Sequence, residues 1–147
     1  MAVYHLGIDP GQSGGIAVVT LTWAAAVKMP ATEKDILDEI RGWPADGTVA
    51  VIESVHAMPG QGVTSMFTFG QNYGALRMAL TAAGIPWKAV TPQKWQKHFG
   101  LTGGKDDKTA KKNRHKAEAQ RRFPKLKITH ATADALLIAL YAKETYV

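Results

Sequence analysis

Hydrophobic residues in the first thirty positions fall into short runs that are separated by glycine, proline and small polar residues. Such runs are typical of β-strands that are joined by tight turns. The sequence therefore predicts three antiparallel strands, at residues 3–9 (VYHLGID), 15–21 (GIAVVTL) and 23–29 (WAAAVKM).

The rest of the chain alternates between helical and extended patterns. Thr32 as an N-cap, followed by apolar residues on one face, predicts a helix over 32–42. The apolar run 48–53 (TVAVIE) is typical of a buried central strand, and it ends in an acid. Beyond it, the sequence predicts a loop at 56–62, a long helix at 64–83, a strand at 85–90, a helix from Thr91 and Pro92 to Phe99, a basic helix at about 108–122 and an Ala/Leu-rich helix at 130–145.

This order predicts an α/β protein with an RNase H-like fold. In that fold three antiparallel strands and two parallel strands form a five-stranded mixed sheet, and helices cover both of its faces. The fourth strand returns parallel beside the first. A chain of 147 residues fits one such domain, so residues 1–147 are predicted to form a single domain.

Composition excludes several classes of protein. The chain has no cysteine, which excludes disulfides, thiolate metal sites and a thiol nucleophile. We find neither an apolar run long enough to span a membrane nor the pattern of a signal peptide. These features favour a soluble, cytoplasmic protein, although an organelle is not excluded.

Positive charge is concentrated in one segment. Residues 105–127 hold ten Lys and Arg against three Asp and Glu, a net charge of +7, whereas the whole chain carries +6. A basic segment on an otherwise neutral domain is typical of a protein that binds a polyanion such as nucleic acid. A solvated helix face explains the charge about equally well.

Two acids stand where the predicted first and fourth strands end. Asp9 and Glu53 would face each other across one pair of neighbouring strands. Asp9 could simply be a turn residue, because Asp accepts hydrogen bonds from the backbone amides that follow it. Glu53 is harder to explain in that way, since Glu is uncommon in buried strands.

The last helix carries a third acid, Asp134, in the otherwise apolar segment ATADALLIALYA. His130 precedes it by four residues and so lies on the same face, one turn away. Each has an ordinary explanation, a first-turn acid and a capping or core histidine. Together, Asp9, Glu53, His130 and Asp134 stand at the ends of three elements that this topology brings together. Hard oxygen ligands with one imidazole suit Mg²⁺ or Mn²⁺, and two such ions can drive the hydrolysis of a phosphodiester.

Several segments resemble the RuvC-like Holliday-junction resolvases, above all their phage and plastid members. The matching segments follow the order of that family and cover most of the chain: GIDPGQSGGIAV, VAVIES, FGQNYGALRMAL, TPQKWQKHFGL and HATADALLIALYA. The resemblance implies an RNase H fold, a homodimer, and Mg²⁺-dependent symmetric nicking of four-way junction DNA. It implies no small-molecule cofactor beyond the metal.

The resemblance also implies roles for individual residues. Asp9, Glu53 and Asp134 match the three metal-binding carboxylates, and His130 takes the fourth catalytic and metal-binding place. Many bacterial members carry that fourth ligand three residues before the last Asp, where this chain has Ala131.

Contacts with DNA follow from position in the chain. Lys108, Lys111, Lys112 and Arg114 of the basic helix would hold phosphates, and Met58 in the loop would act as a wedge between bases. That loop is about as well explained as a mere connector. An apolar stripe on the long helix (Phe67, Phe69, Tyr73 and Met78) favours the core or a dimer interface over base stacking, and the resemblance implies the interface. Trp87 and Trp95 are predicted to lie in the core.

Three other functions remain open from the sequence. A ribonuclease H-type or flap-specific nuclease would use the same fold and metal site on another substrate. A catalytically silent protein would bind junctions without metal. An ATP-binding module of the actin type also opens with Asp-x-Gly, but it needs two such domains around the nucleotide.

Overall fold

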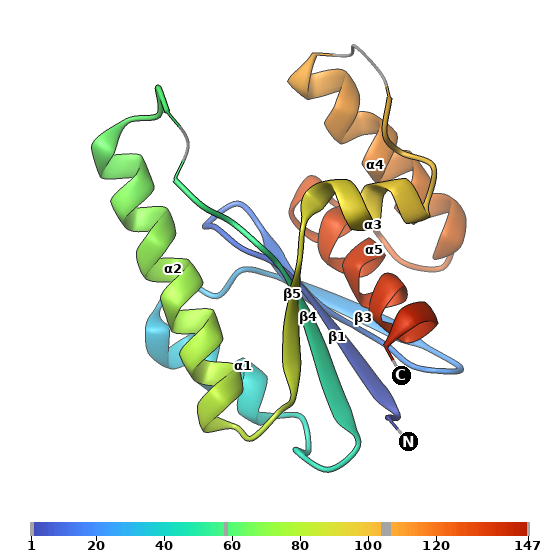
Figure 1. Ribbon diagram of the computed structural model, residues 1–147. Coiled ribbons are helices and arrows are strands. Elements are labelled where there is room, and N and C mark those ends of the chain that lie inside the picture. Colours follow the sequence, from blue (N-terminus) through green and yellow to red (C-terminus); the bar gives the residue numbers. More distant parts are fainter. Residues whose placement is uncertain (1, 58, 104–106, 147) are drawn as a thin grey trace.

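The computed structural model describes residues 2–57, 59–103 and 107–146. A five-stranded sheet in the order β3-β2-β1-β4-β5 forms its centre (Figure 1). Neighbours β1, β2 and β3 are antiparallel, whereas β4 and β5 run parallel to β1. The predicted α/β fold and its mixed sheet are thus confirmed. The strands are β1 (Tyr4–Asp9), β2 (Gly15–Val19), β3 (Ala24–Lys28), β4 (Thr48–Glu53) and β5 (Trp87–Val90).

Helices cover both faces of the sheet, and each face has its own core. On one face α1 and α2 pack over Leu6, Ile8 and Ile52, and on the other α5 packs over Ala17 and Val51. Figure 1 shows α3 and α4 on the same side as α5. The helices are α1 (Glu33–Arg41), α2 (Val63–Ala82), α3 (Pro92–His98), α4 (Lys108–Arg122) and α5 (His130–Thr145).

Element boundaries follow local hydrogen bonds. Thr32 and Thr91 cap α1 and α3 as predicted, each accepting a hydrogen bond from the amide three residues later. The second strand ends two residues earlier than predicted, because Thr20 begins the turn to β3. Its amide and its hydroxyl both donate to the carbonyl of Trp23.

Two glycines let α5 lie unusually close to the sheet. A Cβ at Gly7 of β1 would stand 2.1 Å from the amide nitrogen of Ala139, and one at Gly15 of β2 would stand 2.5 Å from the carbonyl oxygen of Ala131. Both contacts involve the backbone of α5, which cannot move aside as a side chain can. The glycines therefore fix the height of α5 over β1 and β2.

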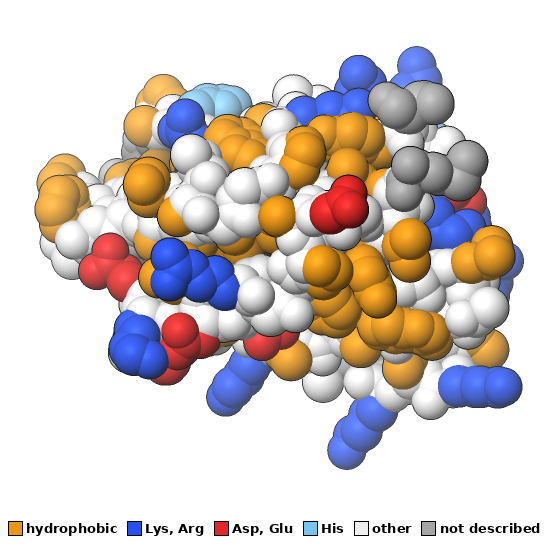
Figure 2. Space-filling view, turned by 90° about the horizontal axis from the view of Figure 1, so that it is seen from below, with side chains coloured by type: hydrophobic (Ala, Val, Ile, Leu, Met, Phe, Trp, Pro, Cys, Tyr) orange, Lys and Arg blue, Asp and Glu red, His pale blue; other side chains and the backbone are white. Residues whose placement is uncertain are grey.

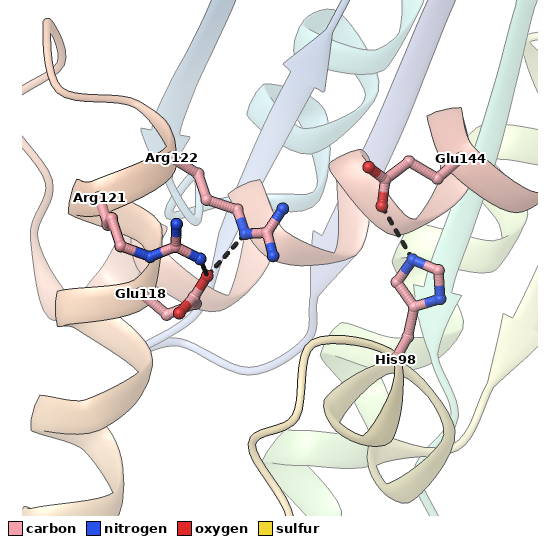
Figure 3. Close-up of polar contacts among 5 residues, drawn as sticks. All are labelled: His98, Glu118, Arg121, Arg122 and Glu144. Carbon is pink, nitrogen blue, oxygen red and sulfur yellow. Dashed lines mark hydrogen bonds and ion pairs between the residues drawn. The ribbon is translucent and has the colours of Figure 1, made fainter.

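Side-chain contacts join the three helices on this side, and Figure 3 shows polar contacts among them. Glu118 of α4 accepts hydrogen bonds from Arg121 and Arg122, and the Arg122 guanidinium also lies over the Phe99 ring. His98 at the end of α3 pairs with Glu144 near the end of α5. These contacts connect the C-terminal end of α3 with the C-terminal ends of α4 and α5.

The surface seen from below in Figure 2 is mixed. Patches of hydrophobic side chains lie between separate lysine and arginine side chains, with scattered acids. Within the described part of the chain, no helix combines the length and apolar character that crossing a membrane requires.

Candidate active site

Asp9 and Glu53 end adjacent parallel strands. Ile8 pairs with Ile52 in the register of β1 and β4, so the two acids follow this pair at the same edge of the sheet. The three residues before each acid are apolar and buried. The topology therefore places both carboxylates where the buried strands reach the surface, as the sequence predicts.

The N-terminal end of α5 completes a cleft at this edge. His130 is the first residue of α5, and Asp134 follows one turn later. Both line a cleft of about 410 Å³ together with Asp9 and Glu53. All four predicted catalytic residues thus meet in one place, and their catalytic and metal-binding roles stay predictions. The remaining lining residues are Pro10, Gly11, Gln12, Ser13, Gly14, Phe69, Lys108, Lys112 and Ala133.

A tight turn between β1 and β2 forms one wall of the cleft. Gly11 adopts a φ of 105°, a left-handed conformation that favours glycine. Its amide donates a 2.7 Å hydrogen bond to Oδ1 of Asn72 on α2, and the Phe69 ring lies beside it. Helix α2 therefore holds the turn that follows Asp9.

Burial and mutual repulsion act on the two strand-end acids. Burial raises the pKa of Asp9 well above its usual value, and the charges of Asp134 and Glu53 raise it further, while Lys112 opposes them. Burial also raises the pKa of Glu53, against the lowering effect of its hydrogen bond from Trp95. The three carboxylates share one electrostatic field that favours added positive charge.

Two residues behind the acids have contacts that the sequence did not reveal. Trp95 is fully buried, as predicted for a core residue, and its Nε1–H also donates a 2.7 Å hydrogen bond to Oε2 of Glu53. His115 of α4 is buried, and its Nδ1 lies 2.9 Å from Oδ1 of Asp134. The one available signal was helical spacing, since His115 and Ala119 form the buried face of a basic helix.

The predicted DNA-binding residues divide into groups. Lys108 and Lys112 line the cleft, and Lys111 lies near enough to lower the pKa of Glu53. Arg114 donates a hydrogen bond to the carbonyl of Leu101, so it helps to attach α4 to the preceding segment. Met58, the predicted wedge, lies outside the described residues. Contacts of all five with DNA stay predictions.

The apolar stripe on α2 is divided between three environments. Phe67 and Met78 are 69% and 63% exposed, Phe69 lines the cleft, and Tyr73 packs against the core. Only the first two offer apolar surface for another chain. The homodimer stays a prediction.

The predicted metal ligands do not form a ready-made metal site in the described part of the chain. Among the described residues, no group of three or more His, Asp and Glu side chains could hold a metal ion as placed. What the structure brings together is a cleft and a shared field of carboxylates.

Comparison with known proteins identifies the fold. No protein-family model matches the chain, and no curated protein sequence matches it. Among solved structures, *Thermus thermophilus* RuvC is similar at 20% sequence identity with a TM-score of 0.61, covering 97% of this chain and 96% of that one. RuvC of the same organism in complex with a Holliday junction substrate matches at 19% identity, with the same coverage and TM-score. The chain therefore has the RuvC fold over almost its whole length.

Proposed function

We propose that this protein is a metal-dependent endonuclease that resolves four-way DNA junctions. The observation that carries the proposal is the cleft itself, in which acids from β1, β4 and α5 meet beside the lysines of α4. A site of this kind combines groups that can hold cations with groups that can hold phosphates. One fold hosts many functions, so the residues of this site indicate the activity more specifically than the fold does.

The residues present fit a hard divalent cation. Carboxylate oxygens are the ligands that Mg²⁺ and Mn²⁺ prefer. Burial raises the pKa of Asp9 most, and the charges of Asp134 and Glu53 raise it further, so a cation among the three acids would relieve their repulsion. Asp9, Glu53 and Asp134 would hold two ions, with His130 as a fourth ligand. When bound, such ions supply activation of the attacking water and stabilisation of the leaving 3′ oxygen.

The other residues of the cleft would bind and orient the DNA strand. Lys108 and Lys112 line the same cleft as the acids, so a phosphodiester placed there would lie between carboxylates and ammonium groups. These lysines and Lys111 are exposed, which leaves them accessible to phosphate oxygens. Their charge would draw the scissile strand into the cleft and balance the charge that develops on the phosphate.

The choice of a four-way junction is supported by the fold comparison. RuvC from *T. thermophilus*, whose fold this chain shares, is described in complex with a Holliday junction substrate. Symmetric nicking of two opposed strands would require two active sites, hence a homodimer. The exposed Phe67 and Met78 of α2 offer apolar surface for that contact.

The experiment that tests this proposal is nicking of a labelled synthetic four-way junction in Mg²⁺. A linear duplex, a fork and an RNA–DNA hybrid serve as competing substrates. Paired symmetric nicks confined to the junction are the expected result. Cleavage of the hybrid or the fork instead would indicate a ribonuclease H-type or flap nuclease, and binding without cleavage would indicate a silent junction-binding protein.

Asp9→Asn is the matched test of the metal site. It should keep junction binding but lower cleavage by at least about 100-fold, because even a lost group behind a metal ligand lowers activity by roughly 10–100-fold. Asp46→Asn, in the loop before β4, is a control that removes one acid elsewhere. Full activity of Asp9→Asn in Mg²⁺ would contradict the assignment.

A further inference from the structure

Two buried donors stand behind the carboxylates of the cleft. Trp95 is 0% exposed and His115 is 3% exposed, yet each reaches an acid that lines the cleft. Trp95 comes from α3 and contacts Glu53 on β4, whereas His115 comes from α4 and contacts Asp134 on α5. Each acid therefore has a partner on an element other than its own.

The two donors also contact each other. The Trp95 and His115 rings lie with centroids 5.4 Å apart and planes at 68°, an edge-to-face arrangement. Glu53, Trp95, His115 and Asp134 thus form one continuous row of contacts through the protein interior. This row joins the two carboxylates by a path that avoids the cleft.

Each donor engages one oxygen of its carboxylate. Trp95 donates to Oε2 of Glu53 and His115 contacts Oδ1 of Asp134, and both acids line the cleft. Within the described residues, Nε2 of His115 is buried without a hydrogen-bond partner. A proton on Nε2 would be a buried unpaired donor, which is rarer in proteins than an underused acceptor. A neutral ring that donates through Nδ1 satisfies this environment.

We propose that the Trp95–His115 pair positions Glu53 and Asp134 for divalent-cation binding and thereby sets the cation affinity of the cleft. The inference rests on the proposed function, since it assumes that these acids hold a cation. Groups hydrogen-bonded behind metal ligands fix the orientation of those ligands, and their loss typically weakens metal affinity or activity by roughly 10–100-fold. Trp95 and His115 are positioning residues in this scheme, since they touch the acids and not the substrate.

The test measures Mn²⁺ binding to the whole, otherwise unmodified chain. Binding is detected by calorimetry or from the electron paramagnetic resonance signal of free Mn²⁺. His115→Leu removes the donor to Asp134 and keeps an apolar side chain, and Trp95→Phe removes the donor to Glu53 and keeps a ring. We expect each to weaken Mn²⁺ binding by about 10-fold or more. His115→Asn, whose amide can donate from nearly the position of Nδ1, should restore binding to within about threefold of the wild type.

The chain offers a matched control in His98. This histidine also pairs with a carboxylate of α5, Glu144, at 2.8 Å (Figure 3). Its ring also makes edge-to-face aromatic contacts. Glu144 is ten residues beyond Asp134 on the same helix, or about 15 Å along its axis. His98→Leu should therefore leave Mn²⁺ affinity unchanged.

Thermal unfolding of each variant in EDTA separates positioning from general destabilisation. The inference holds if His115→Leu and Trp95→Phe lose Mn²⁺ affinity beyond His98→Leu at matched metal-free stability, and if His115→Asn recovers it. Wild-type affinity in Trp95→Phe and His115→Leu would overturn the inference while leaving the proposed function intact. Equal losses in His115→Asn and His115→Leu would also overturn it. Absence of Mn²⁺ binding by the wild type would overturn the inference and the metal-dependent function together.

Discussion

Replacing Gly7 with alanine should disturb both the fold and the cleft. Gly7 lies on β1 directly beneath α5, and an added Cβ would stand 2.1 Å from the amide nitrogen of Ala139 and 2.4 Å from the carbonyl oxygen of Ala135. Ordinary contact begins at 3.4 Å, so this separation must grow by about 1.3 Å. Both neighbours are backbone atoms, which leaves movement of the whole helix as the main route of relief.

The size of the effect follows from that movement. Overpacking a core typically lowers the free energy of unfolding by about 1–3 kcal/mol, and a clash with helix backbone belongs at the upper end. For a chain of this size 3 kcal/mol corresponds to a fall in Tm of roughly 6–12 °C. Asp134 directly precedes Ala135, so the same shift moves it relative to Asp9 on β1. A displacement near 1 Å can reduce a reaction rate about 100-fold.

Urea denaturation and junction nicking of Gly7→Ala, both below its Tm, measure the two effects. Gly74→Ala is the matched control, because a Cβ at this position of α2 meets nothing within 4 Å. Alanine there should stabilise the helix by about 0.5–1 kcal/mol. Measurements at two protein concentrations reveal any contribution from self-association. Wild-type stability and nicking in Gly7→Ala would refute the packing argument.

Two further predictions concern charge in the cleft. The raised pKa values of Asp9 and Glu53 mean that their ionised forms destabilise the metal-free fold. Their contribution to the free energy of unfolding should therefore rise as the pH falls through their raised pKa values toward the ordinary pKa values, 3.8 for Asp9 and 4.5 for Glu53. Urea denaturation in EDTA across pH should show this rise in the wild type and a flatter profile in an Asp9→Asn, Glu53→Gln variant, whereas identical profiles would contradict it. Lys112→Gln should weaken junction binding and reduce the salt dependence of log Kd by about one, measured by fluorescence anisotropy. Equal Kd and equal salt dependence in Lys112→Gln and in the control Lys34→Gln on α1 would exclude a contact between Lys112 and a DNA phosphate.

Much of the fold could be predicted because local signals and topology agree. The short apolar run TVAVIE is typical of a buried strand, and tight turns separate the three strands before it. Once β4 is placed parallel to β1, Asp9 and Glu53 must end at the same edge. The position of Asp134 followed from an almost wholly apolar helix, which had to lie on the sheet. Sequence pattern therefore located the cleft.

The side-chain contacts behind and beside the cleft could not be predicted in the same way. Trp95 resembles any core aromatic residue, and its hydrogen-bond partner is 42 positions away in the sequence. His115 stands in a helix whose other residues are mostly charged or polar, so its four-residue spacing from Ala119 is the one sequence signal of burial. Arg114 was predicted to contact DNA, but its hydrogen bond to Leu101 depends on how α4 packs. Such contacts depend on side-chain geometry between distant elements.

The cleft joins parts of the protein that differ in how firmly they are held. Asp9, Glu53 and Asp134 stand on β1, β4 and α5, where Gly7 and Gly15 allow close backbone packing. Burial and the charge of Asp134 raise the pKa of Asp9 and of Glu53, so the fold disfavours the ionised form of these two acids. The lysines stand on α4, a helix whose buried residues are only His115 and Ala119 within its described length. Because His115 also contacts Asp134, the same packing of α4 that brings Lys108 and Lys112 to the cleft places an imidazole against one of its carboxylates.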